Sequence, residues 1–447
     1  MKVISSLHRL HGGVHPASHK DRTAALPVEV LPSSVLTAEP LYISLHQNIG
    51  APSKMTVAVG DHVRRGQLIA DAGAFVGSVV HAPTSGTIKA VESRMGFSGR
   101  PVLHAVLVAD GEDAAAEPMP AIDWGRADTK AVVERIKQAG VIGMGGAGFP
   151  NQVKVSPPPG SVIDTLILNG AECEPYLTCD HRLMVERTQE LVEGALILRH
   201  VLGGPKVRIA IETNKPDAIE ALAAIEPPAG VDMAVVTLEP SYPQGGEKQA
   251  VYTVTGREIP VGGLPAHVGC VVENVGTTYA IWDAVVRGNP LYERITTVTG
   301  PALVSPKNVL ARIGLSYRTL IEYCGGLADE VEKVLSGGPM MGFAQGNLDM
   351  CVGKATSGIV ALRARDVTAF QSAPCIGCGR CNNACTLRLL PSEMGLACEA
   401  DDIDEAERHG ILNCCECGAC AFSCPAHRPL VQHFRRVRGI LAARKKK

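Results

Sequence analysis

The stretch from residue 375 to residue 424 constrains this chain most, because eight cysteines fall there in two runs of one spacing. The first run reads CIGCGRCNNAC and the second CCECGACAFSC, and each contains C-x2-C-x2-C-x3-C. Three thiolates two residues apart can hold three corners of one iron–sulfur cube, while the following helix carries the fourth thiolate to the other cube. The pattern therefore predicts two 4Fe–4S clusters with crossed ligands. Cluster 1 takes Cys375, Cys378, Cys381 and Cys424, and cluster 2 takes Cys385, Cys414, Cys417 and Cys420.

A zinc site is the alternative for these cysteines, but zinc usually takes four ligands as two well-separated pairs. The doubled run, whose second copy is followed by Pro425, fits the ligand pattern of bacterial two-cluster ferredoxins better. Thr386 stands where the first run would usually carry proline, which loosens the turn but removes no ligand. Cys415 is an extra thiol, and its use in place of Cys414 would break the two-residue spacing.

Length and composition predict several domains with substantial cores, since the chain has 447 residues of which 46% are hydrophobic. A net charge of -2 predicts no nucleic-acid partner. The remaining seven cysteines show no disulfide framework, which together with cluster ligation predicts a reducing cytoplasm. Neither a signal peptide nor a run of eighteen apolar residues is apparent, so we expect any membrane contact to be indirect.

The last stretch of the sequence is basic, with Arg435, Arg436 and Arg438 followed by ARKKK. A solvated end is the favoured interpretation of these charges. Contact with acidic lipid head groups or with an acidic partner is the alternative.

Residues 1–108 contain short alternating apolar runs and many turn residues, which predicts β structure. VGDHVRRGQLIADAG followed by VVHAPTSGTIKAV resembles the barrel-sandwich hybrid fold of biotinyl and lipoyl carrier domains. Those domains carry a modifiable lysine at a hairpin tip, whereas residues 71–80 contain none. We therefore expect a structural or docking role for this domain.

Residues 109–125 are acidic and rich in Ala and Pro, which predicts a linker, and residues 126–292 alternate strand and helix patterns, which predicts a Rossmann-like α/β domain. Gly143 and Gly145 begin the loop GMGGAGFP, which would let backbone amides approach a phosphate closely. Lys154 follows at a reach that suits a phosphate or the edge of a flavin ring. Such a loop alone is weak support, because tight turns use the same residues.

Polar residues follow the expected strands of this α/β domain. Asn169, Glu172 and Glu174 come after VIDTLILN, Glu247 lies in YPQGGEK, and VVENVGTT ends one strand and begins a helix. Ligands of α/β folds bind at the carboxyl ends of strands. Taken one at a time, each of these residues is better explained as a cap or a turn.

Residues 293–362 predict a β-grasp module, with a helix near 316–323 and with Met340 and Met341 in its core. Residues 363–447 predict the helical, ferredoxin-type domain that carries both clusters. The expected fold is therefore multidomain, α/β plus β, with four domains in the order barrel-sandwich hybrid, flavin/NADH-binding α/β, β-grasp and two-cluster helical domain.

The motifs taken together resemble the C subunit of Rnf-type ion-translocating ferredoxin:NAD oxidoreductase complexes. The resemblance covers nearly the whole chain through GGVHP, HAPTSG, GMGGAGFPNQVK, LILNGAECEP, YPQGGEKQ, ENVGTTYAI, GGPMMG and both cysteine runs. The middle portion also resembles the NADH-binding flavoprotein subunit of respiratory complex I. That relative has acids where this chain has Ala171 and Lys248.

The resemblance implies non-covalent FMN, NAD(H) and two 4Fe–4S clusters. It implies FMN contacts from Gly143, Gly145, Lys154, Asn169, Glu172, Glu247, Asn274 and Thr277. It implies NADH contacts from Phe149, Glu172, Glu174 and Glu247. Hydride transfer to a flavin needs no general acid or base, so we assign no catalytic residue.

The expected function is a peripheral oxidoreductase subunit on the cytoplasmic side of a bacterial inner membrane. It would pass electrons between NADH, FMN, the clusters and the membrane subunits of an Rnf-type complex. One alternative is the flavin/iron–sulfur corrin reductase of bacterial microcompartments, whose barrel-sandwich segment comes late rather than first. The other is a relay scaffold with clusters but no nucleotide site.

Overall fold

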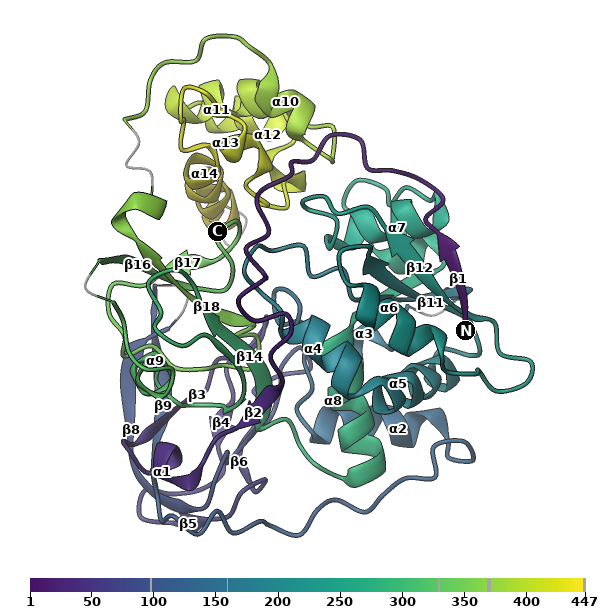
Figure 1. Ribbon diagram of the computed structural model, residues 1–447, viewed down its shortest axis with the longest axis vertical. Coiled ribbons are helices and arrows are strands. Elements are labelled where there is room, and N and C mark those ends of the chain that lie inside the picture. The colour runs from purple at the N-terminus through teal and green to yellow at the C-terminus, as the bar shows by residue number, and fades with distance from the viewer. Residues whose placement is uncertain (97–98, 159, 329, 368–370, 445–447) are drawn as a thin grey trace.

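The computed structural model describes residues 1–96, 99–158, 160–328, 330–367 and 371–444, which form four packed units (Figure 1). A helical unit lies at one end, an α/β unit and a β-grasp unit lie beside each other, and a β-sandwich unit lies at the other end. Within the described residues, no helix is long and apolar enough to cross a membrane.

A five-stranded parallel sheet forms the α/β unit, in the order β1-β12-β11-β10-β13. Its inner strands are apolar on both faces: Leu166 and Leu168 join one core, and Ile167 joins another. Helices α5 and α8 cover the first face and α7 covers the second, as parallel sheets require. The strands are β1 (Lys2–Ser5), β10 (Thr165–Asn169), β11 (Lys206–Glu212), β12 (Met233–Leu238) and β13 (Cys270–Asn274). The helices are α2 (Thr129–Gln138), α3 (Asn151–Lys154), α4 (Cys179–Glu186), α5 (Thr188–Val201), α6 (Pro216–Ala223), α7 (Glu247–Thr255) and α8 (Val275–Trp282).

The strand order places a topological switch point between β10 and β13. Along the chain, β10, β11 and β12 are added in one direction, whereas β13 pairs with the other side of β10. Connections leave the two neighbouring strands toward opposite sides at such a point, and open α/β sheets bind ligands at the carboxyl ends of those strands. We call this edge of the sheet, at the ends of β10 and β13, the crevice. Asn169 and Asn274, the last residues of these strands, lie directly opposite each other in the register.

The N-terminal thirty residues do not belong to the β-sandwich, although the sequence grouped all of residues 1–108 together. Strand β1 pairs with β12 in the α/β sheet, and β2 (Val28–Val30) pairs with β15 in the β-grasp sheet. Between them the chain passes alongside the helical unit, where the Gly13 amide donates to the Ala384 carbonyl at 3.0 Å (Figure 1). The N-terminal segment therefore ties three units together.

The β-sandwich consists of one four-stranded and one three-stranded sheet, in the orders β3-β9-β8-β5 and β4-β6-β7. Short alternating runs and glycine turns account for its small strands. The hairpin between β6 and β7 carries Phe75, whose side chain is 81% exposed, where a carrier domain would present lysine. The strands are β3 (Leu41–Ser44), β4 (Lys54–Met55), β5 (His62–Val63), β6 (Leu68–Asp71), β7 (Val80–His81), β8 (Gly86–Met95) and β9 (Pro101–Ala109).

The β-grasp unit is a six-stranded sheet in the order β17-β16-β18-β14-β15-β2, packed on helix α9 (Tyr317–Tyr323). Ser316 caps this helix by accepting a hydrogen bond from the Thr319 amide. Met341 is 43% exposed, so the expectation that it lies in the core is wrong. The strands are β14 (Glu293–Thr299), β15 (Lys307–Arg312), β16 (Val331–Ser336), β17 (Phe343–Ala344) and β18 (Gly358–Arg363).

The C-terminal unit is helical and has its own core, in which Met394, Phe434 and Val437 are fully buried. The arginines of α14 are not free charges, because Arg435 and Arg438 pair with Glu416. Arg436 likewise pairs with Asp401. The rest of the predicted basic end, Lys445 to Lys447, lies outside the described residues. The helices are α10 (Arg380–Ala384), α11 (Pro391–Glu399), α12 (Ile403–Arg408), α13 (Ala419–Phe422) and α14 (Leu430–Arg444); helix α1 (Ser33–Leu36) lies before the β-sandwich.

One buried lysine joins three of the four units. Lys354 of the β-grasp unit is 1% exposed, and its ammonium donates to the Val79 carbonyl at 2.6 Å and the Gly140 carbonyl at 2.7 Å. It also donates to the Ser78 hydroxyl at 3.1 Å. Gly140 lies directly before the glycine loop, so this contact fixes where that loop begins.

Replacing Lys354 with methionine should destabilise the protein by about 3 kcal/mol, because three buried acceptors would lose a charged donor. Only the Ser78 hydroxyl would remain as a donor to the Val79 and Gly140 carbonyls. Urea denaturation followed by tryptophan fluorescence measures the change. Lys89→Met, at an exposed position of β8, is the matched control and should shift stability by less than about 0.5 kcal/mol. Equal midpoints for the two variants would contradict the assigned role of Lys354.

Candidate functional site

Two asparagines organise the crevice at the switch point. The side-chain amide of Asn169 donates a hydrogen bond to the Gly245 carbonyl at 2.7 Å. This bond links the end of β10 to the loop after β12. Asn274 caps α8, because its side-chain oxygen accepts hydrogen bonds from the amides of Gly276 and Thr277. Both predicted residues thus have local structural roles, as their residue types allow, and they also lie at the ligand-binding end of the sheet.

The glycine loop lies over the start of α8. The Met144 amide donates to the Thr277 hydroxyl at 2.8 Å, and a Cβ on Gly145 would come within 2.7 Å of the Asn274 side chain. Glycine at position 145 is therefore required by a close approach. A Cβ on Gly146 would meet nothing within 4 Å, so this part of the loop faces open space. The structure thus brings Gly143, Gly145, Asn274 and Thr277 together.

Lys154 and two carboxylates form the charged part of the crevice. The Lys154 ammonium lies 3.0 Å from a Glu247 oxygen, and although burial opposes its charge, Glu273 and Glu247 raise its pKa. Glu273 is fully buried, and burial raises its pKa. Among the described residues, neither its carboxylate nor the buried Asn151 side-chain amide makes a hydrogen bond of normal length, although Asn151 lies close enough to lower the pKa of Glu273. Unsatisfied buried polar atoms of this kind are expected where a polar ligand binds.

Two other predicted acids are already engaged by backbone amides. Glu172 accepts from the Asp180 amide at 2.8 Å and the His181 amide at 3.3 Å, and so caps α4. Glu174 accepts from the amides of Met340 and Met341 at 3.1 and 2.8 Å. Burial raises the pKa of Glu174, and these amides oppose the rise. The resemblance implied that both acids lie near the nicotinamide and ribose of NADH and that Glu172 also contacts FMN, but it did not indicate these structural contacts.

The loop after β10 is held in a strained shape by two lysines. Glu172 and Tyr176 have positive φ angles of 43° and 71° without being glycine. Lys20 donates to the carbonyls of Glu172, Glu174 and Leu177, and Lys215 donates to that of Ala171 at 2.6 Å. Strain that the surroundings enforce is typical of binding loops. Neither lysine could have been found from the sequence, because both lie far from the loop in the chain.

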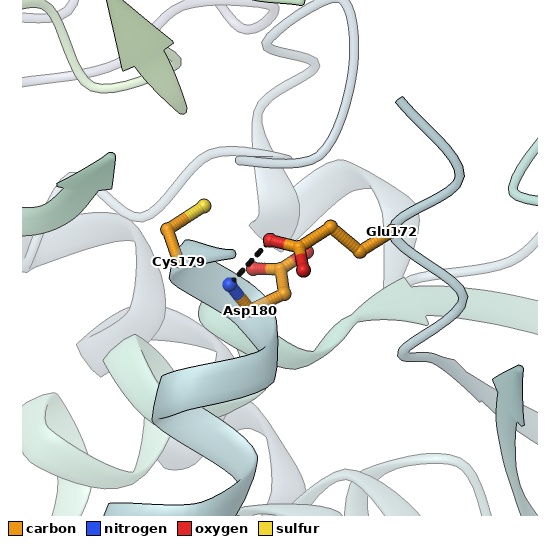
Figure 2. Close-up of side chains that lie close together, drawn as sticks. All are labelled: Glu172, Cys179 and Asp180. Atoms are coloured by element: carbon orange, nitrogen blue, oxygen red, sulfur yellow. Dashed lines mark hydrogen bonds between the residues drawn. The ribbon is translucent and has the colours of Figure 1, made fainter. Parts of the chain in front are cut away.

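Glu172, Cys179 and Asp180 lie close together at the start of α4, in an arrangement that could suggest a metal site (Figure 2). The Glu172 oxygens, however, already accept two amide hydrogen bonds, and the Lys20 ammonium lies 3.8 Å from one of them. Burial and the Glu172 charge raise the pKa of Asp180 to about 6. The group is explained by helix capping, and we assign no cation to it.

The eight predicted ligand cysteines gather around two cavities in the helical unit. Cys375, Cys378, Cys381 and Cys424 line one cavity of about 200 Å³. Cys385, Cys414, Cys417 and Cys420 line the other, together with Cys415. Each set of four thus combines three cysteines of one run with the last cysteine of the other. We call the two sets cage 1 and cage 2.

The crossing of the two runs follows from two short helices that pack against each other. Helix α10 begins within the first run and ends just before Cys385, while α13 begins within the second run and ends two residues before Cys424. Gly379 and Gly418 precede the two helices with φ angles of 70° and 84°, which few other residues adopt. Each helix therefore carries the fourth thiolate of its run to the opposite cage.

Cage 2 adjoins the α/β unit. The Tyr242 hydroxyl donates to the Cys417 carbonyl at 2.7 Å, and Val14, Tyr242, Ala384 and Ala419 share a small apolar core. The Thr386 hydroxyl accepts a hydrogen bond from the side-chain amide of Gln249 in α7 at 2.8 Å, a contact that proline could not make. Tyr242 was not singled out from the sequence.

Comparisons with known proteins match three of the four units, and the first match also includes part of the N-terminal segment. Residues 8–112 match the family model described as the RnfC barrel sandwich hybrid domain, residues 136–283 match the Nuo51 FMN-binding domain, and residues 295–344 match the SLBB domain. The chain is also similar in fold to a chain of the NAD+-reducing [NiFe]-hydrogenase, with a TM-score of 0.51 at 17% identity. That match covers 71% of this chain and 64% of the hydrogenase chain.

Several curated relatives match nearly the whole chain. The C subunit of the proton-translocating ferredoxin:NAD(+) oxidoreductase complex of Clostridium ljungdahlii is 45% identical, over 96% of this chain and 93% of its own. The C subunit of the Na(+)-translocating complex of Acetobacterium woodii is 39% identical, over 97% and 98%. The C subunit of the ion-translocating oxidoreductase complex of Rhodobacter capsulatus is 39% identical, over 97% and 83%.

The α/β unit and its crevice therefore define a flavoprotein with an FMN-binding domain of the Nuo51 type. The order of the units and the full-length matches narrow this class further. The chain belongs to the family of C subunits of Rnf-type ion-translocating ferredoxin:NAD(+) oxidoreductase complexes.

Lys154→Ala should lower flavin retention at least tenfold, since a charge-assisted hydrogen bond contributes about 1.5–3 kcal/mol and 1.4 kcal/mol is tenfold in affinity. Flavin released by heat from purified protein, and the Kd of added FMN, measure the effect. Lys137→Ala on the exposed side of α2 is the control and should retain flavin normally. Normal FMN affinity in the Lys154 variant would exclude this lysine from the flavin site.

Cys424→Ala should remove the same cluster as Cys378→Ala, although the two residues lie in different runs, because both line cage 1. Cys385→Ala should remove the other cluster. Each variant should retain about four irons per chain, and electron paramagnetic resonance should show which signal is lost. Cys398→Ala is the control, because Cys398 is buried in α11 and lines neither cage. Loss of different signals in the Cys424 and Cys378 variants would disprove the crossed assignment.

Proposed function

We propose that this chain is the peripheral electron-transfer subunit of an ion-translocating ferredoxin:NAD oxidoreductase complex. It would pass electrons between NAD(H), FMN and two 4Fe–4S clusters. The observation that carries the proposal is the contact of cage 2 with the loop that borders the switch-point crevice, through Tyr242 and Cys417. A nucleotide cleft and a cluster domain joined at one small core suit electron transfer between them.

The crevice has the donors and acceptors that FMN would need. Lys154 and the open amides around Gly146 suit the phosphate, whereas the unsatisfied Glu273 carboxylate suits donors such as the ribityl hydroxyls. Asn169 and Asn274 would border the isoalloxazine from the two strand ends. When bound, the flavin supplies the conversion between two-electron and one-electron transfer, and the protein supplies position and electrostatics.

NADH would enter the same crevice beside the glycine loop. Phe149 is half-buried at the end of that loop and offers a ring on which the nicotinamide can stack. Glu247 lies at the start of α7, partly exposed, and can accept hydrogen bonds from ribose hydroxyls. Glu172 and Glu174 would contribute mainly by holding the loop after β10 in shape.

The clusters would act in a fixed order. Cage 2 contacts the α/β unit, so it would exchange electrons with the flavin. In cage 1, Cys378 is exposed and the neighbouring Ile376 is 68% exposed, so this cage would face a protein partner. We place that partner among the membrane subunits of the complex, on the cytoplasmic side of the inner membrane. Contact of this chain with the membrane would then be indirect.

The alternatives are less well supported. In the corrin reductase, the barrel-sandwich segment comes late, whereas here residues 8–112 match it ahead of the flavin domain at 136–283. A relay scaffold without a nucleotide site would not need the glycine loop or the unsatisfied Glu273 and Asn151. Both features instead fit a bound nucleotide.

The proposal predicts that anaerobically purified protein contains about eight irons, about eight acid-labile sulfides and one flavin per chain. When NADH is mixed with the protein under anaerobic conditions, the visible absorption of the flavin and of the clusters should bleach. A variant lacking Lys154 should keep its iron but bleach poorly. Iron near zero, or full flavin with no NADH bleaching, would disprove the proposal.

A further inference from the structure

Tyr242 is a side chain that connects the loop after β12 to the main chain of cage 2. It lies in the loop after β12, is 1% exposed and donates its hydroxyl proton to the main-chain carbonyl of Cys417 at 2.7 Å. This hydrogen bond reaches the main chain of a cage cysteine directly from the α/β unit.

The backbone and ring of Tyr242 are both held in place. Its amide and carbonyl pair with those of Val14 at 2.8 Å, and its ring packs with Ala384 and Ala419, which border the two cage runs. Cys173 and Met340 pack against the same core. Because five segments fix the ring, the hydroxyl has one position relative to the Cys417 peptide, and the hydrogen bond costs little conformational entropy.

We infer that Tyr242 is a positioning residue for the cluster of cage 2, and that its hydroxyl raises the reduction potential of that cluster. The inference rests on the proposed function, since it requires a cluster in cage 2. Hydrogen bonds near the cluster sulfurs are one means by which proteins set such potentials. Tyr242 acts through the peptide of Cys417 and takes no part in the transfer chemistry itself.

The sign follows from electrostatics. The Cys417 carbonyl oxygen carries partial negative charge close to a thiolate ligand, and a donated hydrogen bond withdraws some of it. An added electron makes the cluster more negative. A decrease in the negative charge nearby therefore favours the reduced cluster. Removing the hydroxyl should therefore lower the potential. Loss of one ordinary hydrogen bond should lower the reduced-to-oxidised ratio at a fixed potential about fivefold, which corresponds to about 41 mV for one electron.

The test is an anaerobic redox titration of full-length Tyr242→Phe followed by electron paramagnetic resonance. Phenylalanine keeps the ring and its packing and removes the hydroxyl, which also lies beside the buried Glu174 carboxylate and lowers the pKa of that acid. The signals of the two clusters are assigned by the losses in Cys378→Ala and Cys417→Ala. We expect the cage 2 signal to titrate at lower potential and the cage 1 signal to stay unchanged. Tyr317→Phe is the matched control, because Tyr317 is also 1% exposed and its hydroxyl bonds to Ser336 at 2.6 Å, away from both cages.

A second variant separates positioning from packing. Site-specific 3-fluorotyrosine in place of Tyr242 keeps the hydroxyl and makes it a stronger donor, so the cage 2 potential should rise, opposite to the phenylalanine variant. A purely structural role would move neither potential, or both together, and either result would overturn the inference. Selective loss of the cage 2 cluster in Tyr242→Phe would show a structural role and would likewise overturn the inference about the potential. Wild-type protein without iron would instead refute the proposed function, which the iron assay detects before any titration.

Discussion

The docking of the helical unit on the α/β unit is the interaction on which the rest of the structure depends. It is made by a small core in which Val14, Tyr242, Ala384 and Ala419 meet. Cofactors in separate units can exchange electrons only if the units hold them close together. This interface fixes how the helical unit and the α/β unit lie against each other. The N-terminal segment contributes to it from one side and then continues to the β-grasp sheet, so the same stretch of chain sets the position of three units.

The two cages show how short-range sequence spacing produces a long-range arrangement. Within each run, two-residue spacing keeps three thiolates on one loop, and a four- or five-residue helix moves the fourth to the other cage. Neither cage can be completed without the partner run. Helix α11 between the runs and helix α14 after them pack around Met394 and Phe434, and this core holds the runs at the required separation. The positions of the ligand cysteines therefore depend on the packing of the whole helical unit.

This explains which features could be predicted from the sequence. The cage sets follow from local spacing, and Asn169 and Asn274 follow from the rule that polar residues after buried strands meet at one edge of the sheet. Strands β1 and β2 could not be placed, because a strand of three or four residues is defined by its distant partner rather than by its own composition. Tyr242 carries no local signal either, since its function depends on a carbonyl 175 residues away.

The acids of the crevice show a further limit of prediction from the sequence, because their contacts depend on distant parts of the chain. The resemblance assigned Glu172 and Glu174 to nucleotide contact, but their carboxylates are largely satisfied by amides of α4 and of the β-grasp unit. Gly338 has no room for a Cβ beside Glu174, so the GGPMMG motif is shaped by this acid rather than by a ligand. Buried lysines then hold the loop by its carbonyls. A loop stabilised in this way before any ligand arrives loses little entropy on binding, and its charges serve the site by fixing shape. The crevice is thus preorganised by contacts from the N-terminal segment and the β-grasp unit as well as from its own unit, which is why no single unit explains it.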